Sequence, residues 1–470
     1  MSAIDHDAFF SPANPELHAL RRRISAETLG PGVKRAALAH LAAPMTSCTE
    51  LAVAVGAACD EVRAAYRFVH NNPEVQAFVS SLFYPHRLWT AFATRTVAEW
   101  LADPTRADRL LAGQPVLAST VELHPSRGTC GYRCTMCLWS DKDELTYASR
   151  DLRADGMLTA DDWCRILDEL HAGGTRRVVV SGGGEALLNP ELPTIMRHAR
   201  TLGLAVHLYT TGFDLPPARI QLWEELLGLA QVRFSIHSPH PDTYDAIIGF
   251  PGRLGALERV TAHIARLLSL RHGGTAPRVG IGFVTQPLNY DQVAAMADFA
   301  AGLGVDFLDV RKNEVDVTDE LTWEQMGTLR RQLRTVRATA VAGGYGRLRV
   351  DLGDELVAIA NNQPILRRRT PECLVKHFRP TISPFGILAP CDLKAEPRFA
   401  DSAFNLGVVT RQSLGELVAT LAERFVPDRC AQCMPSSRTG NGVYHKLLTD
   451  LRDGVGLTEQ PFALDVTTPR

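Results

Sequence analysis

Three cysteines stand close together near residue 130 of this 470-residue chain. Cys130, Cys134 and Cys137 form a Cys-x3-Cys-x2-Cys group, and Gly128 and Gly131 would let the backbone turn tightly around a bound group. Three thiolates on one loop can hold three irons of a [4Fe–4S] cluster, and one iron then stays open to another ligand. The alternatives are zinc and unrelated buried thiols. Zinc ligands usually come as two pairs, so the triplet disfavours zinc.

A second cysteine group lies near the end of the chain. Cys373 and Cys391 are followed by a Cys-x2-Cys pair, Cys430 and Cys433. Four thiolates can close all four corners of a second [4Fe–4S] cluster, and by number alone they suit a structural zinc equally. A fully ligated cluster cannot bind substrate, which leaves electron transfer or structural support as its role. Cys164 stands alone in a helical pattern and is expected to be a small core residue.

The elements that must position these groups follow an alternating pattern. Short β-rich runs alternate with longer amphipathic stretches, which predicts an α/β fold with a parallel sheet and an active site at the C-terminal ends of the strands. The expected strands are residues 119–123, 177–181, 205–210, 232–238, 279–284 and 307–310. The expected helices between them are residues 160–172, 191–202, 217–229, 253–271 and 290–303.

The same patterns divide the chain into three parts. Residues 1–113 are expected to form an N-terminal helical domain, residues 114–320 the α/β barrel, and residues 321–470 a linker helix with the C-terminal cysteine region. The 50 basic and 52 acidic residues nearly balance, so no overall field favours nucleic acid or an anionic membrane. No apolar run approaches the ~18 residues of a membrane span. The acidic N-terminus lacks the order of a signal peptide, so a cytoplasmic protein is expected.

The cysteine triplet at the end of the first strand resembles that of the radical S-adenosylmethionine (SAM) superfamily. The resemblance implies a partial (β/α)6 TIM-type barrel in which SAM chelates the open iron. One electron then cleaves SAM to a 5′-deoxyadenosyl radical that takes a hydrogen atom from the substrate. Met136 stands where the family usually has an aromatic residue, and it preserves an apolar contact.

Further positions at the expected strand ends are similar to family positions. The run Ser-Gly-Gly-Gly-Glu at residues 181–185 looks like the family's Gly-Gly-Glu element. His237 stands where many relatives have Asp, and with Glu314 it is a candidate for proton donation. The SAM contacts that the resemblance implies are Gly183, Gly184, Glu185, Thr210, Ser235 and Arg311.

The second cysteine group resembles the twitch domain, the shortened form of the SPASM extension, because no cysteine follows Cys433. The implied cofactors are therefore SAM and two [4Fe–4S] clusters, with a one-electron donor such as flavodoxin or ferredoxin. Residues 233–249 and 305–314 look like radical SAM enzymes that act on sugars in antibiotic biosynthesis. One such relative is the deaminase of the desosamine pathway. Twitch-bearing relatives include a diol dehydratase acting on paromamine and alcohol dehydrogenases of aminocyclitols or amino sugars.

These likenesses imply an amino sugar or aminoglycoside substrate, from which a carbinol hydrogen is abstracted. If an acid such as Glu314 or His237 protonates the neighbouring hydroxyl, water leaves; if the electron passes to the second cluster, a ketone forms. We expect dehydration. A polycationic substrate needs carboxylates, and residues 138–156 could serve as an acidic lid. The candidate substrate contacts are Glu122, His124, Asp309, Glu314, Asp316, Asp392 and Glu396.

Two other classes of function have some support in the sequence. Residues 47–63 have a sequence pattern typical of a helix-turn-helix motif. Asp60 and Glu61 at the start of the second helix would, however, repel DNA phosphates, so we expect this region to form a helical cap on the barrel. Peptide modification is the other alternative. Such enzymes usually bind a leader peptide along a strand edge, and the N-terminal region has little strand pattern.

Overall fold

The structure of the chain, a computed structural model, describes most of the region from residue 104 to residue 424 and shorter stretches outside it. The described residues are 24, 29–42, 56–58, 60–62, 64–65, 104–126, 130–137, 157–249, 255–271, 274, 276–313, 321–360, 373–395, 404–424, 437, 441, 444 and 448. Among these residues, no helix combines the length and apolar character needed to cross a membrane.

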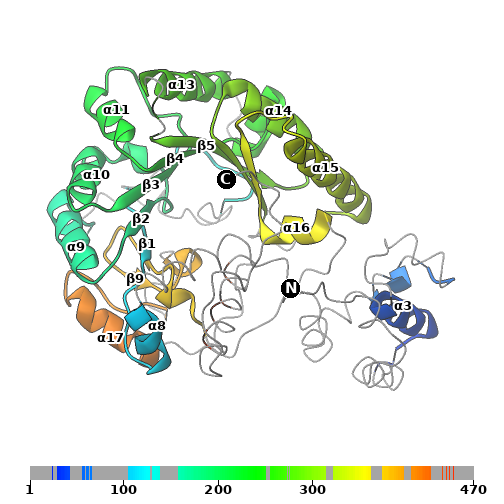
Figure 1. The fold of residues 1–470 in the computed structure, drawn as a ribbon, viewed down its shortest axis with the longest axis horizontal. Helices are drawn as coiled ribbons and strands as arrows, with labels where there is room; N and C mark the ends of the chain where they lie inside the picture. Colours follow the sequence, from blue (N-terminus) through cyan, green and yellow to red (C-terminus); the bar gives the residue numbers. More distant parts are fainter. Residues whose placement is uncertain are drawn as a thin grey trace.

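A single mixed sheet organises the described part of the chain. Its strand order is β7-β6-β5-β4-β3-β2-β1-β8-β9; neighbouring strands from β7 to β8 run parallel, and β9 is antiparallel to β8. The strands are β1 (Thr120–Leu123), β2 (Arg177–Val180), β3 (Ala205–Thr210), β4 (Gln231–Ser235), β5 (Arg278–Thr285), β6 (Phe307–Lys312), β7 (Arg349–Leu352), β8 (Thr381–Ile382) and β9 (Leu388–Ala389). Figure 1 shows β1 to β6 as an arc with helices around its outer side.

From β1 to β7, each strand is connected to the next through at least one α-helix, as is usual for crossovers between parallel strands, whereas a short turn joins the antiparallel pair β8 and β9. The α-helices are α3 (Pro31–Ala42), α8 (Pro104–Leu111), α9 (Ala160–Ala172), α10 (Leu192–Thr201), α11 (Ile220–Leu227), α12 (Pro241–Ile248), α13 (Ala256–Leu270), α14 (Val293–Leu303), α15 (Trp323–Val341), α16 (Asp354–Ala360) and α17 (Leu414–Arg424). Short 3₁₀ turns are η1 (Ala186–Leu188), η3 (Val375–His377) and η4 (Asp392–Ala395).

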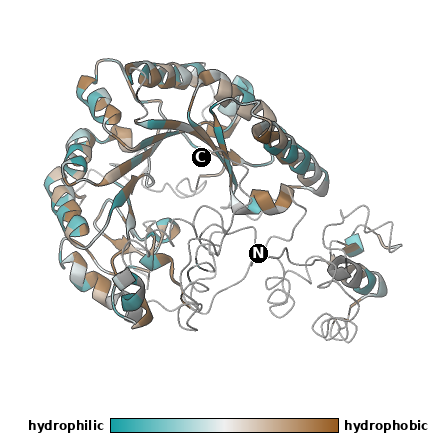
Figure 2. Ribbon diagram, viewed as in Figure 1, coloured by the Kyte–Doolittle hydropathy of each residue, from teal (hydrophilic) through white to brown (hydrophobic). Residues whose placement is uncertain are grey.

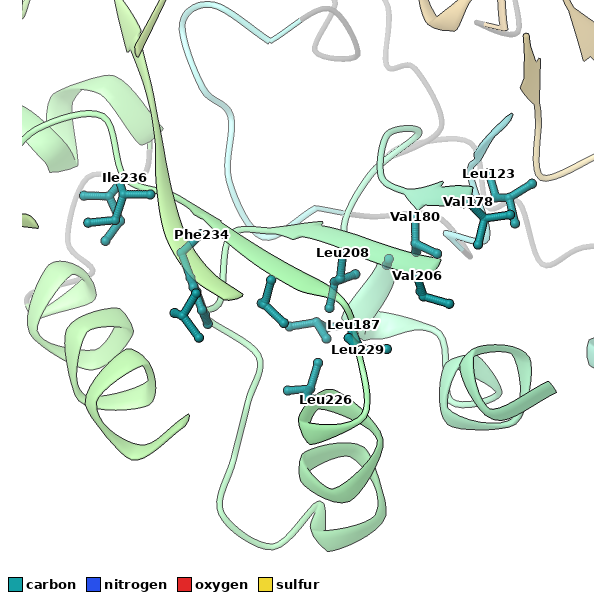
Figure 3. Packing of buried hydrophobic residues seen from close by; sticks show 14 of the residues in the cluster. Leu123, Val178, Val180, Leu187, Val206, Leu208, Leu226, Leu229, Phe234 and Ile236 are labelled. Carbon is teal, nitrogen blue, oxygen red and sulfur yellow. The ribbon is translucent and has the colours of Figure 1, made fainter. Parts of the chain in front are cut away.

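Side chains alternate between the two faces of each strand, and this alternation separates core from site. In β3, Val206 and Leu208 are buried in one hydrophobic cluster with Leu226 of α11 (Figure 3), while His207 and Tyr209 point to the other face and are partly exposed. Burying one such aliphatic side chain contributes about 1.5–3 kcal/mol. The outer helices carry apolar and polar residues together (Figure 2), as amphipathic helices do. The concave face of the sheet is therefore left for polar side chains.

The expected α/β class with a parallel sheet is confirmed, and each of the six predicted strands is present. α9 has its predicted range and begins with a capping box, in which Thr159 and Asp162 bond each other's backbone N–H groups. The sheet also continues past residue 320, where the prediction ended the barrel, because α15 returns the chain to form β7 beside β6.

Several predicted features lie outside the described residues. Most of the predicted N-terminal domain belongs to them, as do most of the helix-turn-helix stretch and the acidic segment 138–156. The individual candidates outside the described residues are Glu314, Asp316, Glu396, Cys430 and Cys433.

Candidate active site

The cysteine loop, defined here as residues 130–137, follows β1 at its C-terminal end and rests on the end of α12. The backbone N–H of Arg133 donates to the Ile248 carbonyl over 2.7 Å, and that of Thr135 donates to the Ile247 carbonyl over 2.9 Å. Gly249 ends α12 with φ +62°, and a Cβ at this position would lie 2.3 Å from the Arg133 carbonyl oxygen. A glycine is therefore required for the loop to lie this close to the helix end.

Side-chain contacts fix the other sides of this loop. The Tyr132 ring packs edge-on against Tyr244 of α12, with ring centroids 6.3 Å apart, and contacts Phe213 after β3. The Thr135 hydroxyl donates to Gln286 at the end of β5 over 2.8 Å. Three separate strand and helix ends thus hold the loop over one end of the sheet.

The three thiols of the loop lie within electrostatic range of one another. Burial, and then the charge of Glu185, raise the pKa of Cys130 to about 12; burial, and then the charges of Cys137 and Cys130, raise the pKa of Cys134 well above its usual value. Across the described residues, no three Cys, His, Asp or Glu side chains are gathered in metal-binding geometry. The donor set still fits an iron–sulfur cluster, because thiolates are its ligands and mutually repelling thiolates need a cation between them.

A turn of three glycines, residues 182–184 and here called the glycine turn, follows β2 beside this loop. All three glycines have positive φ, with values of 51°, 67° and 133°. A Cβ on Gly182 would lie 2.2 Å from the Nε2 atom of His124, so the histidine packs directly under the turn. Successive backbone groups in such a turn are accessible to a ligand because no side chain covers them.

Glu185, directly after the glycine turn, is buried and already well bonded. One carboxylate oxygen accepts from the Leu187 N–H at 3.0 Å and the Thr210 hydroxyl at 2.7 Å; the other accepts from the N–H and hydroxyl of Thr211, both at 2.7 Å. Burial raises the pKa of Glu185, and these hydrogen bonds oppose that shift. The Glu185 side chain therefore connects the end of β2 to the end of β3. The ammonium group of a bound ligand would have to compete with Thr210 and Thr211 for its carboxylate oxygens.

His237 follows β4 and lies buried between strand ends. Its Nδ1 accepts a hydrogen bond from the Val284 N–H at 3.2 Å, and its carbonyl accepts from Asn289. Burial, and then the positive charge of Arg233, lower the pKa of His237 to about 3. The imidazole is neutral near pH 7 and carries its proton on Nε2. Burial therefore disfavours the protonated form that a proton donor needs, while Nε2 of the neutral ring can donate a hydrogen bond.

Asp309 of β6 faces the concave side between two arginines. It pairs with Arg233 of β4 at 2.6 Å and with Arg311 of its own strand at 2.7 Å. Burial alone would raise the pKa of Asp309, but the two guanidinium groups outweigh it and lower the pKa. Ser235, two residues after Arg233, lies partly exposed opposite Gly282. The carboxylate expected to meet a substrate ammonium is thus neutralised by the protein itself.

Glu122 of β1 is likewise paired within the protein. One of its oxygens accepts from Arg379 Nε at 2.8 Å and Nη2 at 2.5 Å, while the other contacts His124 Nε2 at 3.2 Å and accepts from the Ser181 hydroxyl. Burial would raise the pKa of Glu122, but Arg379 and the two other partners hold it well below its usual range. The predicted substrate contact is therefore wrong for Glu122, since its carboxylate is fully engaged.

Arg379 belongs to the C-terminal segment, defined here as residues 373–395, which also carries Cys373 and Cys391. This segment forms η3, β8, β9 and η4, and β8 pairs in parallel with β1. Asp392, adjacent to Cys391, lies 4.0 Å from Arg379. Burial, and then the charge of Glu122, raise the pKa of Asp392. Half of the second cysteine group is thus docked on the strand that carries the first group.

Sequence reasoning located the strand ends but missed the residues that connect them. Arg379, Gln286 and Gly249 were not singled out, although Gly249 directly follows a helical pattern and has the signal of a C-terminal cap. Arg379 gives no local signal, because it lies 257 residues from its partner Glu122. The described candidates brought to this end of the sheet are Cys130, Cys134, Cys137, Gly183, Gly184, Glu185, Thr210, Ser235, His237 and Arg311.

Comparison with known families agrees with this arrangement. Residues 127–300, from the cysteine loop into α14, match the sequence model of the radical SAM superfamily. This part of the chain is therefore similar to the domains of the radical SAM superfamily.

Among characterised proteins, the chain is similar to a sugar enzyme and to a peptide enzyme. It is 29% identical over 216 residues to dTDP-4-amino-4,6-dideoxy-D-glucose ammonia-lyase of Streptomyces venezuelae, covering 44% of this chain and 42% of that protein. It is 27% identical over 266 residues to the PqqA peptide cyclase of Streptomyces rochei, covering 56% of this chain and 66% of that protein. The matches span less than two thirds of these relatives' own lengths.

Among solved structures, Streptococcus suis SuiB bound to its precursor peptide SuiA superimposes with a TM-score of 0.52. The sequences are 14% identical, and the match covers 77% of this chain and 79% of that chain. This likeness extends beyond residues 127–300 and concerns the fold alone.

Proposed function

We propose that this radical SAM enzyme abstracts a carbinol hydrogen from an amino sugar or aminoglycoside intermediate and removes water from the vicinal diol. The observation that carries the proposal is the cysteine loop at the C-terminal end of β1, beside the glycine turn, in a domain that matches the radical SAM superfamily. Similarity to an ammonia-lyase of a dTDP-amino sugar supports a sugar substrate. That relative's name describes the same type of step, elimination of a group from a sugar.

In this proposal Cys130, Cys134 and Cys137 hold the cluster. A three-thiolate cluster with bound SAM supplies, on one-electron reduction, a radical that takes a hydrogen atom from the substrate. The proposed SAM contacts are Gly183, Gly184, Glu185, Thr210, Ser235 and Arg311. The electron donor is a flavodoxin or a ferredoxin, and a second cluster on Cys373, Cys391, Cys430 and Cys433 takes part in electron transfer.

Elimination then requires a proton for the departing hydroxyl and loss of the carbinol O–H proton. The substrate loses one hydrogen atom, releases water, and finally accepts one electron and one proton, which leaves a deoxy ketone. His237 orients a hydroxyl through its Nε2–H, because its imidazole is neutral. Glu314, which follows β6 in the sequence, is the proposed proton donor.

A second candidate is modification of a ribosomal peptide, which the similarity to PqqA peptide cyclase favours. A third outcome of the same radical is dehydrogenation, in which the carbinol radical loses a proton and an electron and a ketone forms. The three possibilities differ in the mass and identity of the product, so one experiment separates them.

The test is anaerobic incubation of the reconstituted protein with SAM, a reductant and three substrate sets: paromamine-like pseudodisaccharides, dTDP-amino sugars and precursor peptides. We expect 5′-deoxyadenosine and a sugar product that has lost water. Loss of two hydrogens would establish dehydrogenation, and a modified peptide would replace the sugar proposal.

Cys137→Ala should abolish 5′-deoxyadenosine formation, because it removes a ligand of the reactive cluster. Cys164→Ala is the matched control, since this thiol lies on the outer helix α9. Equal loss in both variants would contradict the assignment of the cluster to the cysteine loop.

A further inference from the structure

Glu122 is the centre of a buried polar network that joins three separate parts of the chain. Its side chain is 3% exposed, and it contacts His124 of the same strand end, Ser181 after β2 and Arg379 of the C-terminal segment. A carboxylate offers about four lone-pair positions, and these contacts use all of them. Moving any one partner therefore changes the hydrogen bonds that the others can make.

Two of these partners shape the glycine turn. Ser181 immediately precedes the turn, and its N–H donates to the Leu123 carbonyl at 3.0 Å while its hydroxyl donates to Glu122. His124 lies beneath Gly182, in the volume that a Cβ would occupy. Residues 181 and 182 thus rest on groups whose orientation Glu122 fixes.

The third partner comes from a distant part of the sequence. Both Nε and Nη2 of Arg379 donate to one carboxylate oxygen of Glu122. The next residue, Pro380, adds a backbone contact, because its carbonyl accepts from the Glu122 N–H at 2.9 Å. Without the guanidinium, Glu122 would lose its strongest opposite charge and keep only His124 beside it, so burial would favour its protonated form. A protonated Glu122 donates one hydrogen bond in place of accepting it, so its contacts with Ser181 and His124 could not all persist.

We infer that Arg379 is a positioning residue for SAM binding: through Glu122 it holds the glycine turn in its binding conformation, so the C-terminal segment sets the affinity of the barrel for SAM. The inference rests on the proposed use of Gly183 and Gly184 as SAM contacts. It assigns the C-terminal segment a role at the first cofactor site that does not depend on a second cluster.

Arg379→Met tests this role, and Arg165→Met is the matched control. Arg165 of α9 also reaches the C-terminal part of the chain, donating to the Val409 carbonyl at 2.8 Å and pairing with Glu169, but it touches nothing near the glycine turn. SAM affinity is measured by equilibrium dialysis on anaerobic, unreduced protein of equal iron content. We expect R379M to weaken SAM binding about tenfold or more, as loss of supporting contacts around a bound group does, and R165M to leave it unchanged.

A second measurement uses metal-free protein and needs no cofactor. Hydrogen–deuterium exchange should become faster in residues 181–188 of R379M but not of R165M, whereas residues 404–414 should respond to R165M. Arg379→Lys and the pair E122Q/R379M should both recover SAM affinity, because R379K keeps a positive charge beside Glu122 and the pair removes the charge of Glu122 itself. The pair also tests the inference if R379M alone fails to fold.

Equal SAM affinity and equal exchange at residues 181–188 in R379M and R165M would overturn the inference. If wild-type protein with a complete cluster does not bind SAM, the proposed function fails instead. The exchange measurement then still decides whether Arg379 holds the turn.

Discussion

At the scale of single residues, the concave face of the sheet neutralises its own carboxylates. Glu122 is paired with Arg379, and Asp309 lies between Arg233 and Arg311. From sequence, each carboxylate at a strand end was a plausible partner for a cationic substrate. Its partner could not be predicted, because ion pairs between strands join residues that are far apart in the chain.

His237 shows why protonation states also escape sequence reasoning. Its position at a strand end was predictable, but its pKa of about 3 results from burial and then from the charge of Arg233. An exposed imidazole has a pKa of about 6.5. The unfolded chain therefore binds a proton that the folded chain does not bind, and the free energy of unfolding falls as the pH drops from about 6.5 towards 3.

We expect His237→Asn to weaken this pH dependence, because an asparagine oxygen can accept from the Val284 N–H without titrating. In thermal melts of metal-free protein, the variant should lose less stability between about pH 7 and pH 5 than the wild type does. His171→Gln on the exposed end of α9 is the control. Parallel pH profiles of wild type and H237N would contradict the lowered pKa.

At the scale of elements, α12 and the cysteine loop form one unit. The loop bonds to the last carbonyls of the helix, which have no partner within the helix itself. Gly249 makes this possible because it combines a left-handed backbone with the absence of a side chain. The unit explains how a short, cysteine-bearing loop keeps a defined position between β1 and α9.

Gly249→Ala should lower iron incorporation, because its Cβ would displace the Arg133 carbonyl and with it the loop. Gly203→Ala is a matched control: Gly203 has φ +77° and nothing within 4 Å of a built Cβ. A left-handed alanine costs about 1–2 kcal/mol of stability at either site. Iron content after anaerobic reconstitution should fall only in G249A. Equal iron content in the two variants would contradict a role of Gly249 in holding the cysteine loop in place.

The elements themselves were largely predictable. Six strands and five of the helices between them follow from the alternation of β-rich and amphipathic runs, and α9 has its predicted ends, but α12 (Pro241–Ile248) was not predicted. β7 was missed because its sequence, Arg-Val-Asp-Leu, lacks an apolar run, and β8 and β9 because two-residue strands carry no periodicity. These three strands form by pairing with neighbouring strands, so their formation depends on tertiary contacts and not on a local sequence pattern.

At the scale of the whole molecule, the two cysteine groups belong to different parts of the chain and are proposed to have different tasks. Cys430→Ala should lower the iron content by about half and spare some SAM cleavage, because the reactive cluster keeps its three ligands. Cys137→Ala should also lower the iron content by about half but abolish SAM cleavage. Iron analysis and chromatography of 5′-deoxyadenosine measure both effects. Zinc in place of iron in C137A would identify the second site as structural.

The pairing of β8 with β1 determines when this edge of the sheet can be completed during biosynthesis. The strand that carries the cysteine loop receives its neighbour from residues 381–382, after nearly all of the sheet has left the ribosome. Until then β1 is an open edge, and Glu122 has no guanidinium partner. The nascent chain therefore cannot complete this part of the sheet, or pair Glu122 with Arg379, before residues 379–382 have been synthesised.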